Sequence, residues 1–372
     1  SFSVGKIEVK ALHTPGHTPE HLSFLVTDYG GGASDPVGIA SGDFVFVGDL
    51  GRPDLLETAA GVSGAMEPSA RRLFESSKRF LALPDFVQVW PGHGAGSACG
   101  KALGAIPQST VGYERRFNSA LAPVSEDDFV NEILSGQPEP PLYFARMKAL
   151  NKTGVPLLHR LPEPRALTPR ELRDAAEQGG PVVVDTRTSR PDFLEDHAHG
   201  ALFAPLGTDF AMVVGSYANP DDEIYLVVEK GELDEAIRTL VRIGYDRVTG
   251  FITPEELLGD QAQNHATTKH IHFADFSLPT DVPRVTLLDV RGAAEFAEGH
   301  LPGAINIAHT RLGNHLDRVP EDRPVWVYCR SGRRAALAAS LLERVGYDVT
   351  HIDGGMEDWP DRSEHEAVSG AA

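Results

Sequence analysis

The chain has 372 residues and a formal net charge of −19, and 41% of its residues are hydrophobic. This length is enough for two or three globular domains, and the acidic balance without a basic block argues against nucleic acid or an anionic membrane as a partner. Two cysteines exclude a disulfide framework and fit a reducing cytoplasm, and neither a secretory signal pattern nor an apolar run near the roughly 18 residues of a membrane span is present.

The first hundred residues alternate short strand-like runs with turns rich in glycine and aspartate. Three of these runs end at His17, Asp49 and His93. Imidazole and carboxylate groups on loop tips, held by strands behind them, are the ligands that a divalent metal takes. The pattern therefore predicts a metal site built from these loops.

The residues around these positions resemble the metallo-β-lactamase fold. The matching strings are Thr14-Pro-Gly-His17-Thr, Gly48-Asp49 and Pro91-Gly-His93-Gly, and the runs Phe46–Asp54 and Gly94–Gly100 look like the persulfide dioxygenase branch of that fold. The resemblance implies part of an αββα sandwich with a single non-haem iron(II), or zinc as the alternative, that oxidises glutathione persulfide or a related persulfide. It implies that His17 and Asp49 are ligands and that His93 lies beside them. Two histidines and a carboxylate would leave open positions on the iron for dioxygen and the persulfide sulfur.

One motif of that family has no match. Its first metal motif, His-x-His-x-Asp-His, belongs upstream of His17, where only sixteen residues stand. His197-Ala-His199 occupies a turn of a repeated module, and His270-Ile-His272 lacks the following Asp-His, so neither is read as a ligand pair. We therefore expect the N-terminal part of this domain to be missing from this chain, which would leave the metal site incomplete and iron weakly bound.

Cys99 lies six residues after His93. It is either a small buried hydrophobe behind a glycine-rich loop or a thiol near the metal pocket that relays sulfur. Residues 101–160 read as helices and loops, and Ser125-Glu-Asp-Asp128 has the form of a capped helix start. We assign residues 1–160 to the C-terminal part of a metallo-β-lactamase-like domain with a helical tail.

The remainder of the chain contains an internal repeat. Pro181–Arg187 matches Val285–Arg291, and Arg242-Ile-Gly-Tyr-Asp246 matches Arg344-Val-Gly-Tyr-Asp348. Near-continuous apolar strands in both copies are typical of a parallel sheet covered by helices on both faces. The repeat predicts one α/β module over residues 161–262 and another over residues 263–372.

The second copy contains a strand, a tight loop and a helix within Val325–Ala336. Cys329 ends the strand and is followed by Arg330, Ser331, Gly332, Arg333 and Arg334. Loop amides and the first N–H groups of a helix lack intrahelical partners and form an anion cradle. The helix dipole and the arginines favour thiolate over thiol, and the thiolate is the nucleophile. The loop predicts a catalytic cysteine with anion-binding neighbours rather than a structural one.

This loop resembles the active-site loop of the rhodanese (sulfurtransferase) family. The resemblance continues through Leu288–Arg291, Gly299–Asn306 and Asp353–Gly355. It implies that Cys329 takes a sulfane sulfur from thiosulfate or a persulfide and passes it to a thiol such as glutathione. Phosphatases of the same fold carry an arginine six places after the cysteine, where this chain has Ala335, so the shorter loop favours sulfur.

The first copy differs at this loop. Glu229 is aligned with Cys329, and the loop arginines are absent. Because a carboxylate cannot accept sulfane sulfur and repels anions, we expect residues 161–262 to form a catalytically inactive module. A spacer, a docking surface and a dimer interface are its remaining roles, and the sequence leaves a homo-oligomer open.

Together these features predict an enzyme of sulfur metabolism, in which a persulfide dioxygenase-like metal domain is coupled to a rhodanese that uses a Cys329 persulfide. Two alternatives stay open: a zinc thioester hydrolase resembling glyoxalase II with accessory rhodanese domains, and a non-catalytic sulfide-responsive binding protein. The strings around Asp49 and Cys99 favour the dioxygenase over the hydrolase. The Cys329 loop argues against a binder, which needs no activated thiolate.

Overall fold

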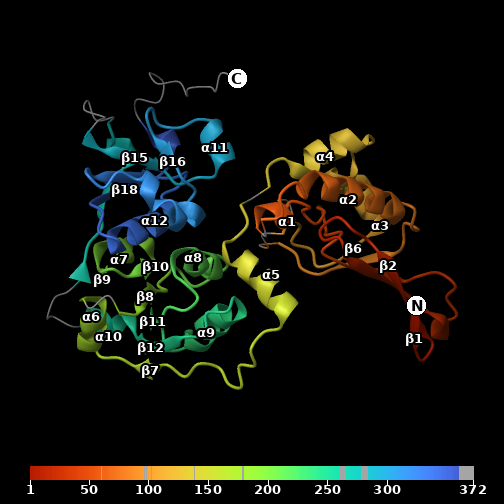
Figure 1. Ribbon diagram of the computed structural model, residues 1–372, viewed down its shortest axis with the longest axis horizontal. Coiled ribbons are helices and arrows are strands. Elements are labelled where there is room, and N and C mark those ends of the chain that lie inside the picture. The colour runs from red at the N-terminus through yellow and green to blue at the C-terminus, as the bar shows by residue number, and fades with distance from the viewer. Residues whose placement is uncertain are drawn as a thin grey trace. The chain divides into compact units, whose positions relative to one another are not determined.

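The computed structural model describes residues 1–359 apart from residues 60, 96, 98, 102, 138, 178–179, 260–264 and 278–283. Its chain divides into two compact units, Ser1–Pro140 and Pro141–Ala372 (Figure 1). None of the helices in the described part combines the length and the apolar character needed to cross a membrane.

The first unit is built on one mixed sheet whose strand order follows the sequence, from β1 to β6. Neighbouring strands pair antiparallel except β4 and β5, which pair parallel. The strands are Phe2–Val4 (β1), Ile7–His13 (β2), Leu22–Asp28 (β3), Gly38–Gly42 (β4), Gln88–Pro91 (β5) and Ser109–Thr110 (β6). The helices are Leu55–Thr58 (α1), Met66–Leu81 (α2), Val111–Phe117 (α3) and Glu126–Leu134 (α4).

Helices α2 and α4 pack against each other and cover the sheet (Figure 1). Ala70, Leu73 and Phe80 of α2 recur at helical spacing, and they join Phe129 of α4 in one buried cluster with β4 and β5. The Ser125 side chain accepts a hydrogen bond from the Asp128 amide, which is the predicted capped start of α4. This packing fixes the strand ends that carry the histidines.

The second unit contains two five-stranded parallel sheets, ordered β10-β8-β11-β12-β7 and β14-β18-β17-β15-β16. We call residues 161–262 the first module and residues 263–372 the second module. The first module has strands Arg165–Ala166 (β7), Val182–Asp185 (β8), His197–Ala198 (β9), Leu202–Phe203 (β10), Ile224–Val227 (β11) and Val248–Ile252 (β12). Its helices are Pro169–Glu177 (α6), Arg190–Glu195 (α7), Phe210–Tyr217 (α8), Leu233–Arg242 (α9) and Pro254–Leu258 (α10).

The second module repeats this plan. Its strands are His265–Ala266 (β13), Lys269–His272 (β14), Thr286–Asp289 (β15), Ile305–Asn306 (β16), Val325–Tyr328 (β17) and Val349–Asp353 (β18), and its helices are Ala293–Ala297 (α11) and Arg333–Arg344 (α12). β13 pairs antiparallel with β9 of the first module. Helix α12 packs against β17 and β18 of its own module and against β10 of the first module.

The two modules share one hydrophobic core, which includes Val213 and Val214 of α8 together with Leu341 and Leu342 of α12. Polar contacts join the same elements: the Ser340 hydroxyl accepts from the Phe203 amide at 3.0 Å. The modules are therefore packed as one body rather than joined by a free linker.

Helix α5 (Tyr143–Thr153) belongs to the second unit. Tyr143 and Met147 pack against the core shared by the two modules. The predicted domain limit at residue 160 follows the sequence repeat, whereas the compact units divide after Pro140.

Candidate functional site

Strand β17 and helix α12 position Cys329 and the loop after it. Cys329 follows the last residue of β17, and Gly332 is the N-cap residue of α12. Gly332 has a φ of 75°, in the left-handed region that favours glycine, so the backbone turns sharply into the helix. Successive amides in such a turn form a concave anion-binding surface, which the helix N-terminus extends.

The Cys329 side chain is fully buried, with 0% of its surface exposed. Arg334 interacts electrostatically with the Cys329 sulfur and forms a two-pronged ion pair with Glu295, at 2.5 and 2.8 Å. This pair raises the pKa of the Arg334 guanidinium and lowers the pKa of the Glu295 carboxyl. The ion pair therefore holds a permanent positive charge beside the sulfur. Cys329 itself is more deeply buried than the sequence suggests.

The outer residues of the loop face solvent. Arg330, Ser331 and Arg333 are exposed, and Arg333 forms an ion pair with Asp209 of the first module at 2.9 Å. Arg334 is less exposed and interacts with the sulfur, while Arg330 and Arg333 lie at the loop surface. They are placed to attract an anion arriving at the loop.

His351 supports the loop from β18 and was not singled out in the sequence. Its Nε2 lies 2.9 Å from the Gly332 carbonyl oxygen. Burial lowers the pKa of His351 to about 4, so the ring is neutral at pH 7. Because a carbonyl only accepts, Nε2 carries the hydrogen and donates to it.

A buried aspartate–arginine pair repeats in the two modules. Arg291 binds both carboxylate oxygens of Asp289, and Arg187 does the same with Asp185. Each arginine also donates to a backbone carbonyl further along the chain, that of Gly299 or of Asp196. These pairs stand at the carboxyl ends of β15 and β8, where ligands bind in parallel α/β sheets.

In the first unit, His17, Asp43 and His93 meet at the ends of β2, β4 and β5. One carboxylate oxygen of Asp43 lies 3.5 Å from Nε2 of His17, and the other lies 3.0 Å from Nε2 of His93. The Asp43 amide donates to Nε2 of His21 at 3.2 Å. The structure therefore brings together two histidines predicted from the sequence, around a carboxylate that was not.

The contact between Asp43 and His93 shifts the pKa of both side chains. The hydrogen bond to His93 lowers the pKa of the Asp43 carboxyl. The same bond raises the pKa of His93 to about 10, and the nearby Cys99 side chain adds to this increase. Asp43 is accordingly ionised at neutral pH, as a metal-binding carboxylate must be.

Comparison with known proteins covers both units. The rhodanese-like domain family matches residues 274–362. A sulfurtransferase of Allochromatium vinosum is 36% identical over 80 residues, which is 21% of this chain and 75% of that protein. The crystal structure of a metallo-β-lactamase from Staphylococcus aureus COL has 43% sequence identity and a TM-score of 0.59, covering 68% of this chain and 70% of that chain.

The chain is a metallo-β-lactamase-fold protein fused to rhodanese-like domains. The expected fold class is confirmed, and the comparisons place the protein in sulfur metabolism. The ETHE1 structure of Myxococcus xanthus also matches, with 24% identity and a TM-score of 0.30 over 41% of this chain and 57% of that chain.

The metal carboxylate of this metallo-β-lactamase-fold protein needs a correction. Asp49, the predicted ligand, is buried and accepts hydrogen bonds from the amides of Leu50 and Lys101. Asp43 stands between the histidines instead. The alternating run 43–49 was read as a strand, but the strand is β4, Gly38–Gly42, and the run is a buried loop after it. The strand end is therefore at Asp43.

The donor set suits a metal in its chemistry. Nδ1 of His17 lies 3.0 Å from the Arg52 carbonyl oxygen and so carries a hydrogen, which makes Nε2, 3.5 Å from Asp43, the ring nitrogen that would bind a metal. With a proton on Nε2 in place of a metal, the same contact is an imidazolium–carboxylate ion pair. Across the described residues, no three or more histidine, cysteine, aspartate or glutamate side chains are arranged as a ready-made metal site.

Cys99 lies beside this group. It is partly exposed, and its side chain lies near enough to His93 to interact with it electrostatically. This position is compatible with a thiol that relays sulfur near the metal pocket and differs from a cysteine packed only in a core. The relay role stays a prediction.

In the first module, strand register corrects the alignment of the cysteine position. Val227 pairs with Asp185 as Tyr328 pairs with Asp289, so Val228 stands where Cys329 stands and Glu229 follows it. The apolar run Ile224–Val228 offers no internal marker of register, which is why the sequence placed Glu229 one residue early. Valine supplies no nucleophile, so the expectation of an inactive module is kept.

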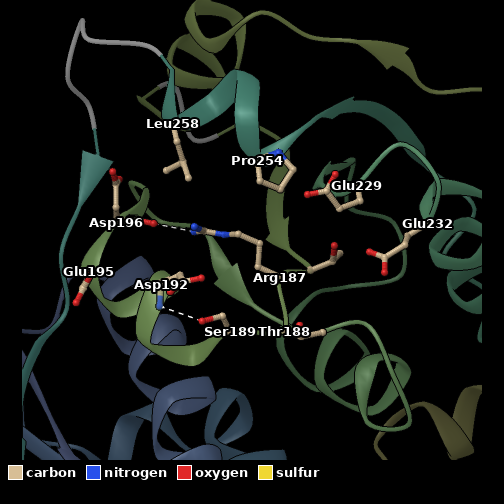
Figure 2. A pocket seen from close by; sticks show the side chains of 11 residues that line it. Arg187, Thr188, Ser189, Asp192, Glu195, Asp196, Glu229, Glu232, Pro254 and Leu258 are labelled. Carbon is tan, nitrogen blue, oxygen red and sulfur yellow. Dashed lines mark hydrogen bonds between the residues drawn. The ribbon is translucent and has the colours of Figure 1, made fainter.

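A cavity of about 480 Å³ opens at this end of the first module (Figure 2). Figure 2 shows Arg187 extending toward Asp196, where it donates to the backbone carbonyl, with Glu229 and Glu232 on the other side. Five carboxylates line the cavity: Asp192, Glu195, Asp196, Glu229 and Glu232. Such a lining repels anionic sulfur donors.

Proposed function

We propose that this protein transfers sulfane sulfur through Cys329. The Cys329 thiolate attacks the outer sulfur of thiosulfate or a persulfide; the donor S–S bond breaks, and sulfite or a thiolate leaves with the electron pair. An acceptor thiolate, such as that of glutathione, then attacks the outer sulfur of the Cys329 persulfide. The acceptor leaves as a persulfide and Cys329 returns to the thiolate.

The observation that carries this proposal is the cationic Arg334 at the sulfur, inside a strand–loop–helix turn. Arg334 stabilises negative charge on Cys329, and Glu295 holds the guanidinium in place. The amides of the loop, with Arg330, Ser331, Gly332 and Arg333 around them, receive the anionic end of the donor. The rhodanese-like family match over residues 274–362 supports the same assignment.

Replacing the nucleophile tests this directly. Cys329→Ser removes the sulfur that forms the persulfide, so transfer from thiosulfate to cyanide falls to background, measured as thiocyanate formed. Glu229→Ala, in the corresponding loop of the first module, is the matched control and keeps wild-type turnover. Retained thiocyanate formation in Cys329→Ser refutes the site assignment.

For the first unit we propose a persulfide dioxygenase-like metal domain that takes one iron(II). His17 and Asp43 would be ligands, with His93 beside them, and iron would supply open positions for dioxygen and a persulfide sulfur. The support is the convergence of these donors at three strand ends, together with the sequence strings around Asp49 and Cys99. Both cysteines are free, which suits the proposed cytoplasmic location.

Metal content and oxygen uptake test this second proposal. In the intact gene product we expect about one iron per molecule by elemental analysis and oxygen consumption with glutathione persulfide. Asp43→Asn removes one ligand charge and lowers iron content by roughly tenfold or more. Two zinc ions with thioester hydrolysis would instead identify a hydrolase, and iron retained in Asp43→Asn would exclude Asp43 as the ligand.

A further inference from the structure

Arg190 belongs to the first module but contacts the sulfur-transfer loop of the second. It begins helix α7, and its Nη1 donates to the Ser331 carbonyl oxygen at 2.8 Å. Its Nη2 lies 2.7 Å from a carboxylate oxygen of Asp353, at the end of β18. Only 26% of the Arg190 side chain and 16% of the Asp353 side chain are exposed, so solvent screens this pair little.

A second contact between the modules reaches the same loop, but it is weaker. Arg333 and Asp209 lie 2.9 Å apart with 59% and 39% of their side chains exposed. Exposed ion pairs contribute little, because water screens them and two side chains must be ordered. Arg190 is therefore the stronger of the two links from the first module to the loop.

The bond from Arg190 fixes the direction of one loop amide. In a trans peptide unit the carbonyl and the N–H point in opposite directions. Holding the Ser331 carbonyl on Arg190 therefore turns the Gly332 N–H away from Arg190. His351 holds the next carbonyl, that of Gly332, which directs the Arg333 N–H in the same manner. Both amides belong to the turn that leads into α12, where the expected anion cradle lies.

Packing at Gly332 shows how closely the pair is fitted to the loop. A Cβ atom on Gly332 would collide with Asp353 and would lie 2.8 Å from Nη1 of Arg190. The Arg190–Asp353 pair therefore lies directly against the loop glycine, and its planar guanidinium holds both partners at once. The catalytic loop is braced by a residue 141 positions away in the sequence.

We propose that Arg190 is a positioning residue for sulfur transfer at Cys329, so that the first module completes the active site of the second. This inference rests on the sulfurtransferase function proposed above. It gives the inactive module a role in catalysis: it sets the orientation of the loop amides. The role requires no chemistry in the first module itself.

Steady-state kinetics of the full chain test this role. We expect Arg190→Ala to lower kcat/KM for thiosulfate by about ten- to a hundredfold, the effect of losing a charge-assisted hydrogen bond. The fall in kcat/KM for cyanide is smaller, because the dianionic donor depends most on the cradle. Arg190→Lys restores part of the activity, since an ammonium keeps the charge but cannot hold both partners in the same geometry.

Arg238→Ala is the matched control. Arg238 is in the same module, in an exposed pair with Asp234 within helix α9, and its loss leaves both kinetic constants unchanged. If Arg190 had only a structural role, Arg190→Ala would lower the fraction of active protein. Both kcat/KM values would then fall equally, and the unfolding temperature would fall with them. Either that result or wild-type kinetics in Arg190→Ala overturns the inference. If the wild-type protein forms no thiocyanate, the proposed function fails as well. If the wild type is active and Cys329→Ser is not, the proposed function holds, and the Arg190→Ala kinetics test the role of Arg190 alone.

Discussion

Gly332 lies where strand β17 passes through the loop into helix α12, and two independent constraints meet at this residue. Its φ of 75° is strained for any residue with a Cβ, and the space beside its Cα is filled by Asp353 and Arg190. The backbone at this point also defines the amide surface above Cys329. A side chain at position 332 would therefore alter the turn and the brace together.

We predict that Gly332→Ala lowers the free energy of unfolding by about 1–3 kcal/mol, the cost of a left-handed non-glycine residue, and that sulfur transfer falls more than tenfold. Urea unfolding and thiocyanate formation measure the two effects. Gly346→Ala is the matched control, because Gly346 has a φ of 94° but open space around its Cα. It should lose less stability than Gly332→Ala, because only the backbone strain applies, and it should keep its activity. An active, stable Gly332→Ala would show that the turn tolerates a side chain.

Helix α12 links the nucleophile to the first module. Its N-terminus faces the Cys329 loop, and near its C-terminus Glu343 reaches Thr268 at 2.9 Å and lies 3.7 Å from Nε2 of His197 in β9. Burial raises the pKa of Glu343 from its ordinary 4.5 to about 7 and lowers the pKa of His197. The protonation state of the Glu343 carboxyl therefore depends on how the two modules pack.

Stability should follow the protonation of Glu343. Its folded pKa is raised, so the stability it contributes is fully present below pH 4.5 and is lost as pH rises through about 7. Between pH 5 and pH 8 the ionisation of Glu343 should lower the free energy of unfolding of the wild type by on the order of 2 kcal/mol. Glu343→Gln should not show this decrease. Denaturant unfolding of both proteins at each pH gives the difference, which cancels the other titrating groups. Glu321→Gln, at an exposed site, is the control, and a difference that stays constant with pH would contradict the assignment.

Contiguous elements could be predicted from the sequence, and register could not. The Cys329 loop was recognisable because strand, loop and helix N-terminus are adjacent in the chain. Asp43 was missed because β4 is a weak strand pattern, Gly-Ile-Ala-Ser-Gly, while the buried loop after it alternates like a strand. Glu229 was placed one residue early because neighbouring strands, not the run itself, set the register of β11.

Contacts between distant segments were also beyond the sequence. The burial of Cys329 follows from the shared core of the two modules, and no local pattern encodes it. Arg190 contacts a loop far away in the chain. In the sequence it is only a charged residue at the start of a helix, which gives no sign of this contact. Both features arise only when the modules pack.

At the scale of the whole molecule, one chain carries a metallo-β-lactamase fold and two rhodanese-like modules. The proposed reactions of the first unit and the second module share compounds. A dioxygenase consumes a persulfide and forms sulfite, and a sulfurtransferase forms a persulfide on its acceptor thiol and releases sulfite from thiosulfate. The first module supports the second through a common core and through Arg190. Sulfur chemistry at Cys329 is the claim on which the rest depends.

Mass spectrometry of the intact protein after incubation with thiosulfate tests that claim most directly. We expect a gain of one sulfur atom on the peptide that contains Cys329, lost again when glutathione is added. The gain should be absent in Cys329→Ser. A protein that gains no sulfur, or gains it only on Cys99, would contradict the account.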